Sequence, residues 1–255
     1  MNDTIKNLFT GIEAEKRKQL LKLMQDWNET LPEENKGFGY DGFFPEYYSS
    51  IPRVLFMARE PRSSGDLIKI TIEDQFNDYY KTYNECKGDH FWRRILCMYH
   101  IIRKNGELDE NMTSDDIAKL AYDTAKSKDY GFAYMNLSKY SNDSGRRDQH
   151  LMRKFFADSK LDRRNFLKEE LELLDPDIII TAHLWDRAIP QITMDAYFGI
   201  ADDLKNKECA EEASLRNYKI KNKTVKLLDL YHFSNKPGFK PDMDFYLKPV
   251  SKLLF

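Results

Sequence analysis

The chain has 255 residues, of which 41% are hydrophobic and 32% are charged. This balance supplies both a core and a solvated surface, so it excludes a disordered chain, and the length is at the upper end for one domain. The net charge of −2 excludes the global basic field of a non-specific DNA binder, but it leaves room for a local basic face.

The three cysteines, Cys86, Cys97 and Cys209, are far apart and form no C-x-x-C motif. We therefore expect neither a zinc nor an iron–sulfur site, and the sequence indicates no metal or cofactor. An odd number of cysteines without a signal-peptide pattern is typical of a cytoplasmic protein. No run of about 18 apolar residues occurs, so no membrane span is expected.

A helical pattern opens the chain and a strand pattern follows it. Residues 4–30 carry apolar side chains at helical spacing and predict an amphipathic helix or a pair of helices. Residues 31–50 contain glycine, proline and many aromatic residues, which indicates an aromatic loop. The apolar run at residues 54–57 is typical of a strand buried on both faces, and Asp89 is predicted to cap the helix that comes next.

Three further apolar runs predict strands later in the chain, at residues 132–135, 177–181 and 224–230. The last of these should pair with residues 217–220. Helical stretches separate the apolar runs, so we expect the strands to be neighbours in one mainly parallel sheet.

The second half of the chain also contains signals for helix ends. Thr113 and Asp116 resemble a capping box that opens a helix, and residues 147–174 predict two more helices. A last helix should begin near Asp242, and Pro249 should kink or end it.

Together these elements predict an α/β fold, a three-layer α/β/α sandwich around a central, mainly parallel sheet. No linker, repeat or low-complexity tract divides the chain, so residues 1–255 are expected to form one domain. Within it, residues 1–35 should form an N-terminal helical extension that packs on the sheet. The sequence does not indicate an oligomeric state.

Polar residues follow three of the predicted strands, at the point where ligands bind in open α/β sheets. They occupy residues 58–62, 136–140 and 231–236. The carboxyl ends of parallel strands meet at one edge of a sheet, so these segments predict a binding site there.

The same segments resemble motifs of the uracil-DNA glycosylase superfamily. Residues 54–61, V-L-F-M-A-R-E-P, resemble its first strand, which ends in Gly-x-[Asp/Asn/Ala]-Pro. Residues 132–139, F-A-Y-M-N-L-S-K, resemble a strand with an Asn-rich turn, and residues 228–234, L-D-L-Y-H-F-S, resemble a final strand ending in His-Pro-Ser. Residues 89–96 are similar to the helix after the first motif. Residues 174–180 are similar to the Pro-led central strand.

The resemblance implies a uracil-DNA glycosylase-like fold and recognition, with hydrolytic excision, of a modified or deaminated base such as uracil. DNA is then the partner, and no cofactor is needed. Ala58 stands in place of the family's Gly, and Phe233 in place of its Pro. An alternative is a non-catalytic member of this fold that binds a nucleotide, nucleic acid or protein. A third possibility is an enzyme that acts on another small substrate.

Two residues are the candidates for catalysis. Glu60 would position the attacking water, and His232 would donate a hydrogen bond to the departing base. The alternative for Glu60 is an ion pair with Arg59 or Arg62. The alternative for His232 is a structural histidine packed on its neighbours.

Three residues are the candidates for base binding. The Asn136 amide would read a base edge, since it offers both donors and acceptors. Its alternative role is a turn residue that bonds its own backbone. Phe44 or Phe91 would stack on the base, whereas most other rings of the aromatic loop are expected in the core.

Phosphate contacts are predicted for Ser234, Lys236 and Lys240, which lie in the segment after the last predicted strand. The alternative for Ser234 is a cap or turn. Basic residues are densest at positions 146–164, but such a run is usually a solvated helix face.

Overall fold

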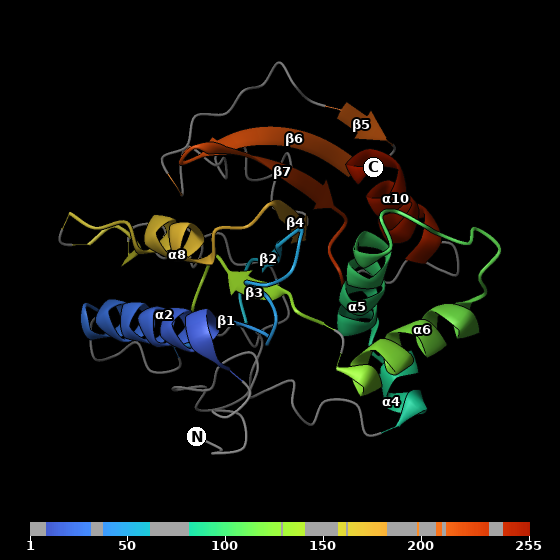
Figure 1. Cartoon of the computed structure of the whole chain (residues 1–255), viewed down its shortest axis with the longest axis horizontal. Helices are drawn as coiled ribbons and strands as arrows, with labels where there is room; N and C mark the ends of the chain where they lie inside the picture. The colour runs from blue at the N-terminus through green and yellow to red at the C-terminus, as the bar shows by residue number, and fades with distance from the viewer. Residues whose placement is uncertain are drawn as a thin grey trace.

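The computed structural model describes residues 9–31, 38–61, 82–128, 130–140, 158–161, 163–182, 198, 208–210, 213–234 and 242–255. These residues form a seven-stranded mixed sheet with the order β1-β3-β2-β4-β7-β6-β5 (Figure 1). The strands are β1 (Gly42–Phe43), β2 (Val54–Ala58), β3 (Ala133–Asn136), β4 (Ile178–Ala182), β5 (Glu208–Ala210), β6 (Ala213–Ile220) and β7 (Lys223–Leu230).

The four central strands, β3, β2, β4 and β7, run parallel to one another. β1 pairs antiparallel with β3 at one edge, and β6 and β5 extend the other edge by antiparallel pairing. The four apolar runs of the sequence are therefore neighbours in one sheet, as predicted. The predicted pairing of residues 217–220 with the last apolar strand is confirmed as part of the β6–β7 ladder.

The helices are α2 (Gly11–Glu29), α4 (Tyr83–Gly88), α5 (His90–Arg103), α6 (Ser114–Ser127), α8 (Phe166–Leu174), the π-helical turn η1 (Met243–Leu247) and α10 (Lys248–Leu254). In Figure 1, α2 and α8 lie on one side of the sheet, and α4, α5, α6 and α10 lie on the other. No helix in the described part of the chain is both long and apolar enough to cross a bilayer.

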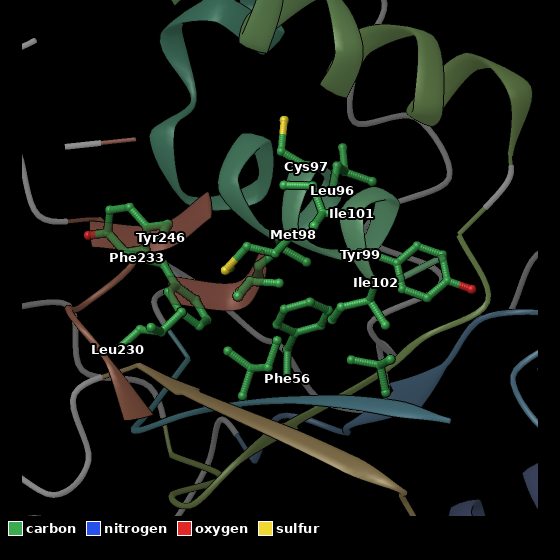
Figure 2. Close-up of a cluster of buried hydrophobic side chains, with 14 of the residues drawn as sticks. Phe56, Leu96, Cys97, Met98, Tyr99, Ile101, Ile102, Leu230, Phe233 and Tyr246 are labelled. Carbon is green, nitrogen blue, oxygen red and sulfur yellow. The ribbon is translucent and has the colours of Figure 1, made fainter. Parts of the chain in front are cut away.

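Alternating side chains of the sheet supply two separate cores, because successive residues of a strand point to opposite faces. Leu55 and Met57 of β2 belong to the core under α2 and α8. Phe56 belongs to the core under α5, and Figure 2 shows it among α5 side chains with Phe233 and Tyr246 nearby. The α/β class and the placement of helices on both faces agree with the sequence.

The predicted helix starts are present at α5 and α6. The Asp89 carboxylate accepts hydrogen bonds from the amides of Phe91 and Trp92. Thr113 and Asp116 form a complete capping box at α6. Each cap satisfies amides that have no partner within the helix and stabilises it by about 1 kcal/mol.

The helix predicted near the start of the chain is present, whereas Pro249 near the other end does not act as predicted. A single helix, α2, covers residues 11–29, and its Trp27 stacks on Phe166 of α8 with ring centroids 5.4 Å apart. At the other end Pro249 does not end the helix. It lies in the first turn of α10, where its missing amide is tolerated, and η1 precedes it.

Candidate functional site

A pocket of about 240 Å³ opens at the carboxyl ends of β2, β3 and β7. These strands run parallel, so their carboxyl ends meet at one edge of the sheet. The volume is below the roughly 300–1,000 Å³ of pockets for drug-sized ligands. The pocket therefore suits a small ligand of one or two rings.

Five of the predicted site residues line this pocket: Glu60, Phe91, Asn136, His232 and Ser234. They come from four segments that are far apart in the sequence. The prediction that Glu60, Asn136 and His232 share one pocket is thus confirmed, whereas the chemical role of each stays a prediction.

Of the three remaining predicted site residues, the structure describes only Phe44. Phe44 is buried in the core, where its ring packs on Tyr130 and Phe132 at centroid distances of 4.9 and 4.7 Å. Of the two candidates for stacking, only Phe91 lines the pocket. Lys236 and Lys240 are outside the described residues.

Residues 39–41, in the loop before β2, line one part of the pocket. Hydrogen bonds to β3 and to the residues after it hold this loop in place. Gly42 and Phe43 pair with β3, and the Gly39 amide donates to the carbonyl of Lys139 over 2.6 Å. These bonds bring Tyr40 and Asp41 to the pocket. The aromatic composition of this loop pointed to the site, but nothing in the sequence singled out Asp41.

Asn136 is the last residue of β3, and its groups are held by neighbours. Its backbone amide donates to Oδ2 of Asp41 over 2.8 Å, and its Nδ2 lies 3.4 Å from Oδ1 of the same carboxylate. The Tyr134 hydroxyl donates to Oδ1 of Asn136 over 3.3 Å. An amide has two hydrogens and two carbonyl lone pairs, and these side-chain contacts use one of each.

The buried lysine Lys139 contacts both Asn136 and Asp41. Lys139 Nζ donates to the carboxylate of Asp41, to the carbonyl of Asn136 over 2.6 Å and to Oε2 of Glu170 over 2.7 Å. Lys139 and Glu170 are almost fully buried. Burial raises the pKa of Glu170 against the opposing effect of the Lys139 cation, and the charge of Asp41 adds to the rise. No local sequence signal pointed to this network.

Glu60 follows β2, whose end is fixed to β3 by bonds from the amides of Leu137 and Ser138 to the carbonyls of Ala58 and Arg59. The Glu60 side chain is only 7% exposed, and its Oε1 is 3.5 Å from an Arg59 nitrogen. The ion pair with Arg59 is therefore present, and it holds the carboxylate beside the pocket.

His232 lies two residues beyond the end of β7, and its ring tautomer follows from its contacts. Its Nδ1 is 3.2 Å from the backbone amide of Ser234 and 3.0 Å from the Ser234 hydroxyl. A backbone amide can only donate, so Nδ1 is the acceptor and Nε2 carries the hydrogen of the neutral ring. The His232 carbonyl accepts a bond from the Tyr246 hydroxyl over 2.7 Å.

Aromatic rings form an apolar wall of the pocket. Phe91, Trp92 and Tyr134 line it together, with centroid distances of 6.2 Å between Phe91 and Tyr134 and 5.1 Å between Trp92 and Tyr134. The ring of Phe91 also lies 6.4 Å from that of His232. Such a wall can take the face of a flat ligand, and the polar groups can take its edge.

Among the described residues, no group of three or more histidine, cysteine, aspartate or glutamate side chains could hold a metal ion. No known family model matches the sequence, and no curated protein matches it.

Proposed function

We propose that the chain binds a modified or deaminated nucleobase, such as uracil, that is turned out of DNA, and that it hydrolyses the glycosidic bond of that base. The observation that carries this proposal is the pocket itself. Glu60, Asn136 and His232, each at the end of a different strand, line a space of nucleobase size beside aromatic rings. The sheet between helices, parallel in its four central strands, agrees with the α/β class that the resemblance to the uracil-DNA glycosylase superfamily implies.

In the proposed reaction, the base stacks on Phe91 and its edge bonds the Asn136 amide. Glu60 orients a water molecule toward the sugar carbon and accepts its proton. The carbon–oxygen bond forms as the bond to the base nitrogen breaks, and the electron pair stays on the base. The hydrogen on Nε2 of His232 would stabilise that charge.

The experiment is single-turnover excision on oligonucleotides that contain uracil or hypoxanthine. We expect the wild-type protein to remove the base and leave an abasic site in the oligonucleotide. Glu60→Gln, which keeps the shape of the side chain and removes its charge, should retain binding and lose most of the excision. Folded wild-type protein that leaves both substrates intact would contradict the catalytic part of the proposal.

A non-catalytic binding protein is the second candidate, and the ion pair between Glu60 and Arg59 favours it. The Arg59 nitrogen beside Oε1 occupies part of the carboxylate that would otherwise orient the attacking water. This candidate predicts that the wild-type protein and Glu60→Gln bind the same bases and that neither excises them.

A further inference from the structure

We propose that Asp41 is a specificity-determining residue, which fixes the polarity of the Asn136 amide and so decides which donor–acceptor edge the pocket accepts. This inference rests on the proposed binding of nucleobases. It adds a residue that acts on the ligand through Asn136.

The contacts of Asp41 determine which way the amide faces. Asp41 accepts from the backbone amide of Asn136 over 2.8 Å, and its other oxygen lies 3.4 Å from Nδ2. An ionised carboxylate can only accept hydrogen bonds. The nitrogen of the amide must therefore face Asp41, and the oxygen must face the Tyr134 hydroxyl, 3.3 Å away.

A reversed amide would meet repulsion in this site. Its carbonyl oxygen would lie against the carboxylate of Asp41, so two acceptors would face each other in a place where Asp41 is only 2% exposed. Buried polar groups without a partner are costly. Asp41 thus favours one orientation strongly, although the amide itself could take either.

An ion pair with Lys139 holds Asp41 in place. Lys139 Nζ contacts Asp41 and also donates to the Asn136 carbonyl over 2.6 Å, so the same cation holds both residues. Glu170 contacts Lys139 on another side, over 2.7 Å, and does not line the pocket. Loss of either carboxylate leaves Lys139 with the other, which makes the two positions a matched pair for substitution.

A fixed amide distinguishes bases whose edges are reversed. Uracil and hypoxanthine present a ring N–H next to a carbonyl oxygen, whereas cytosine and adenine present a ring nitrogen acceptor next to an amino group. One orientation of Asn136 complements only one of these patterns at a given position in the pocket. An amide that is free to turn would accept both.

The test measures the affinities of uracil, cytosine, hypoxanthine and adenine for the wild-type protein, Asp41→Asn and Glu170→Gln by calorimetry. In the wild-type protein and in Glu170→Gln, we expect the affinities for uracil and cytosine to differ by at least about tenfold, because the wrong edge leaves buried groups unpaired. The same ratio is expected between hypoxanthine and adenine. In Asp41→Asn the preference should be lost or reversed, since the oxygen of the new amide must take the Oδ2 position, which accepts from the Asn136 backbone amide and from Lys139. The NH2 group of the new side chain then faces Nδ2 of Asn136 and favours the reversed amide. A general loss of structure would instead weaken both members of a pair equally.

The outcomes separate this inference from the proposed function. A wild-type protein that binds none of the four bases overturns the proposed function, and with it this inference. Wild-type selectivity that survives in Asp41→Asn overturns the role of Asp41 and leaves base binding intact. Thermal melts check that each variant is folded. If Asp41→Asn is not folded, Asp41→Ser leaves room for a water molecule that can donate or accept, and its ratio should fall below about threefold.

Discussion

At the scale of single residues, neighbours orient three polar groups of the pocket, those of His232, Asn136 and Glu60. The Ser234 amide makes Nδ1 of His232 an acceptor, and Asp41 directs the nitrogen of Asn136. Arg59 lies beside Glu60 and holds its carboxylate. A group whose orientation is fixed before the ligand binds loses less entropy on binding, so these neighbours favour affinity as well as selectivity.

His232→Ala should lower the rate of single-turnover excision by about 100-fold or more, which is the usual effect of losing one donor aimed at developing charge. The variant should stay folded, because His232 is half-buried at the end of β7. His100→Ala, in α5 and away from the pocket, is the control and should excise at the wild-type rate. Excision that survives His232→Ala would mean that another residue stabilises the departing base.

The stability of Glu170→Gln relative to the wild-type protein should increase as pH rises. The pKa of Glu170 is raised above its ordinary value of 4.5, first by burial. A raised acid binds its proton more tightly in the folded state, so folding stability is lost as pH rises from about 4.5 through the raised pKa. The Gln side chain removes this loss. Urea unfolding at pH 5 and pH 8 should show that the free energy of unfolding of Glu170→Gln, measured relative to the wild-type protein, increases by about 1 kcal/mol or more. A constant difference would contradict the raised pKa.

At the scale of elements, the turn that carries His232 is held by α5 and η1. Arg94 of α5 donates to the Phe233 carbonyl over 2.5 Å, and Tyr246 of η1 donates to the His232 carbonyl. Asp242, just before η1, bonds Arg94 over 2.8 Å and Arg93 over 2.7 Å. These buried contacts connect the helical layer to the end of β7, so the position of His232 depends on how α5 packs against η1.

Asp242→Asn should lower the free energy of unfolding by about 3–5 kcal/mol, because it leaves two buried guanidinium groups without their anion. Asp244→Asn is the matched control. Asp244 pairs with Lys248 at a side-chain exposure of 31%, and such pairs contribute about 0–1 kcal/mol. Urea unfolding measures the loss of stability in both variants. Equal losses would show that the buried ion pairs of Asp242 stabilise the protein no more than the exposed pair of Asp244.

Elements whose signal is local could be predicted from the sequence. The strands of the parallel core are continuous apolar runs, and the caps of α5 and α6 lie within four residues of the groups they bind. The polar groups at three strand ends also predicted the pocket. Asp41 was missed because its partner Asn136 is 95 residues away. Phe44 was misplaced because a ring that packs in a core and a ring that lines a pocket have the same sequence signature.

At the scale of the whole molecule, the net charge of −2 means that any attraction to DNA must be local. Arg164 is already engaged, since it pairs with Asp26 of α2 and Glu169 of α8. Arg164 thus connects α2 to α8, and most of the basic stretch lies outside the described residues. The predicted phosphate contacts at Lys236 and Lys240 follow the strand that leads to His232 and are close to the site in sequence.

DNA binding should therefore weaken steeply with salt and depend on that loop. Each phosphate contact contributes about 0.7–0.9 to the slope of log affinity against log salt concentration. Lys236→Glu with Lys240→Glu should reduce the slope more than Arg163→Glu with Arg164→Glu. Titrations of a fluorescent oligonucleotide at several salt concentrations make the comparison. Equal slopes in all three proteins would favour a protein or small-molecule partner.

The central claim is that the pocket at the ends of β2, β3 and β7 holds a nucleobase. A crystal structure of the protein soaked with uracil, and separately with hypoxanthine, tests it most directly. We predict a base stacked on Phe91, with its edge at the Asn136 amide and an acceptor facing Nε2 of His232. A base bound elsewhere, or a pocket that stays without a base at saturating concentration, would contradict the claim.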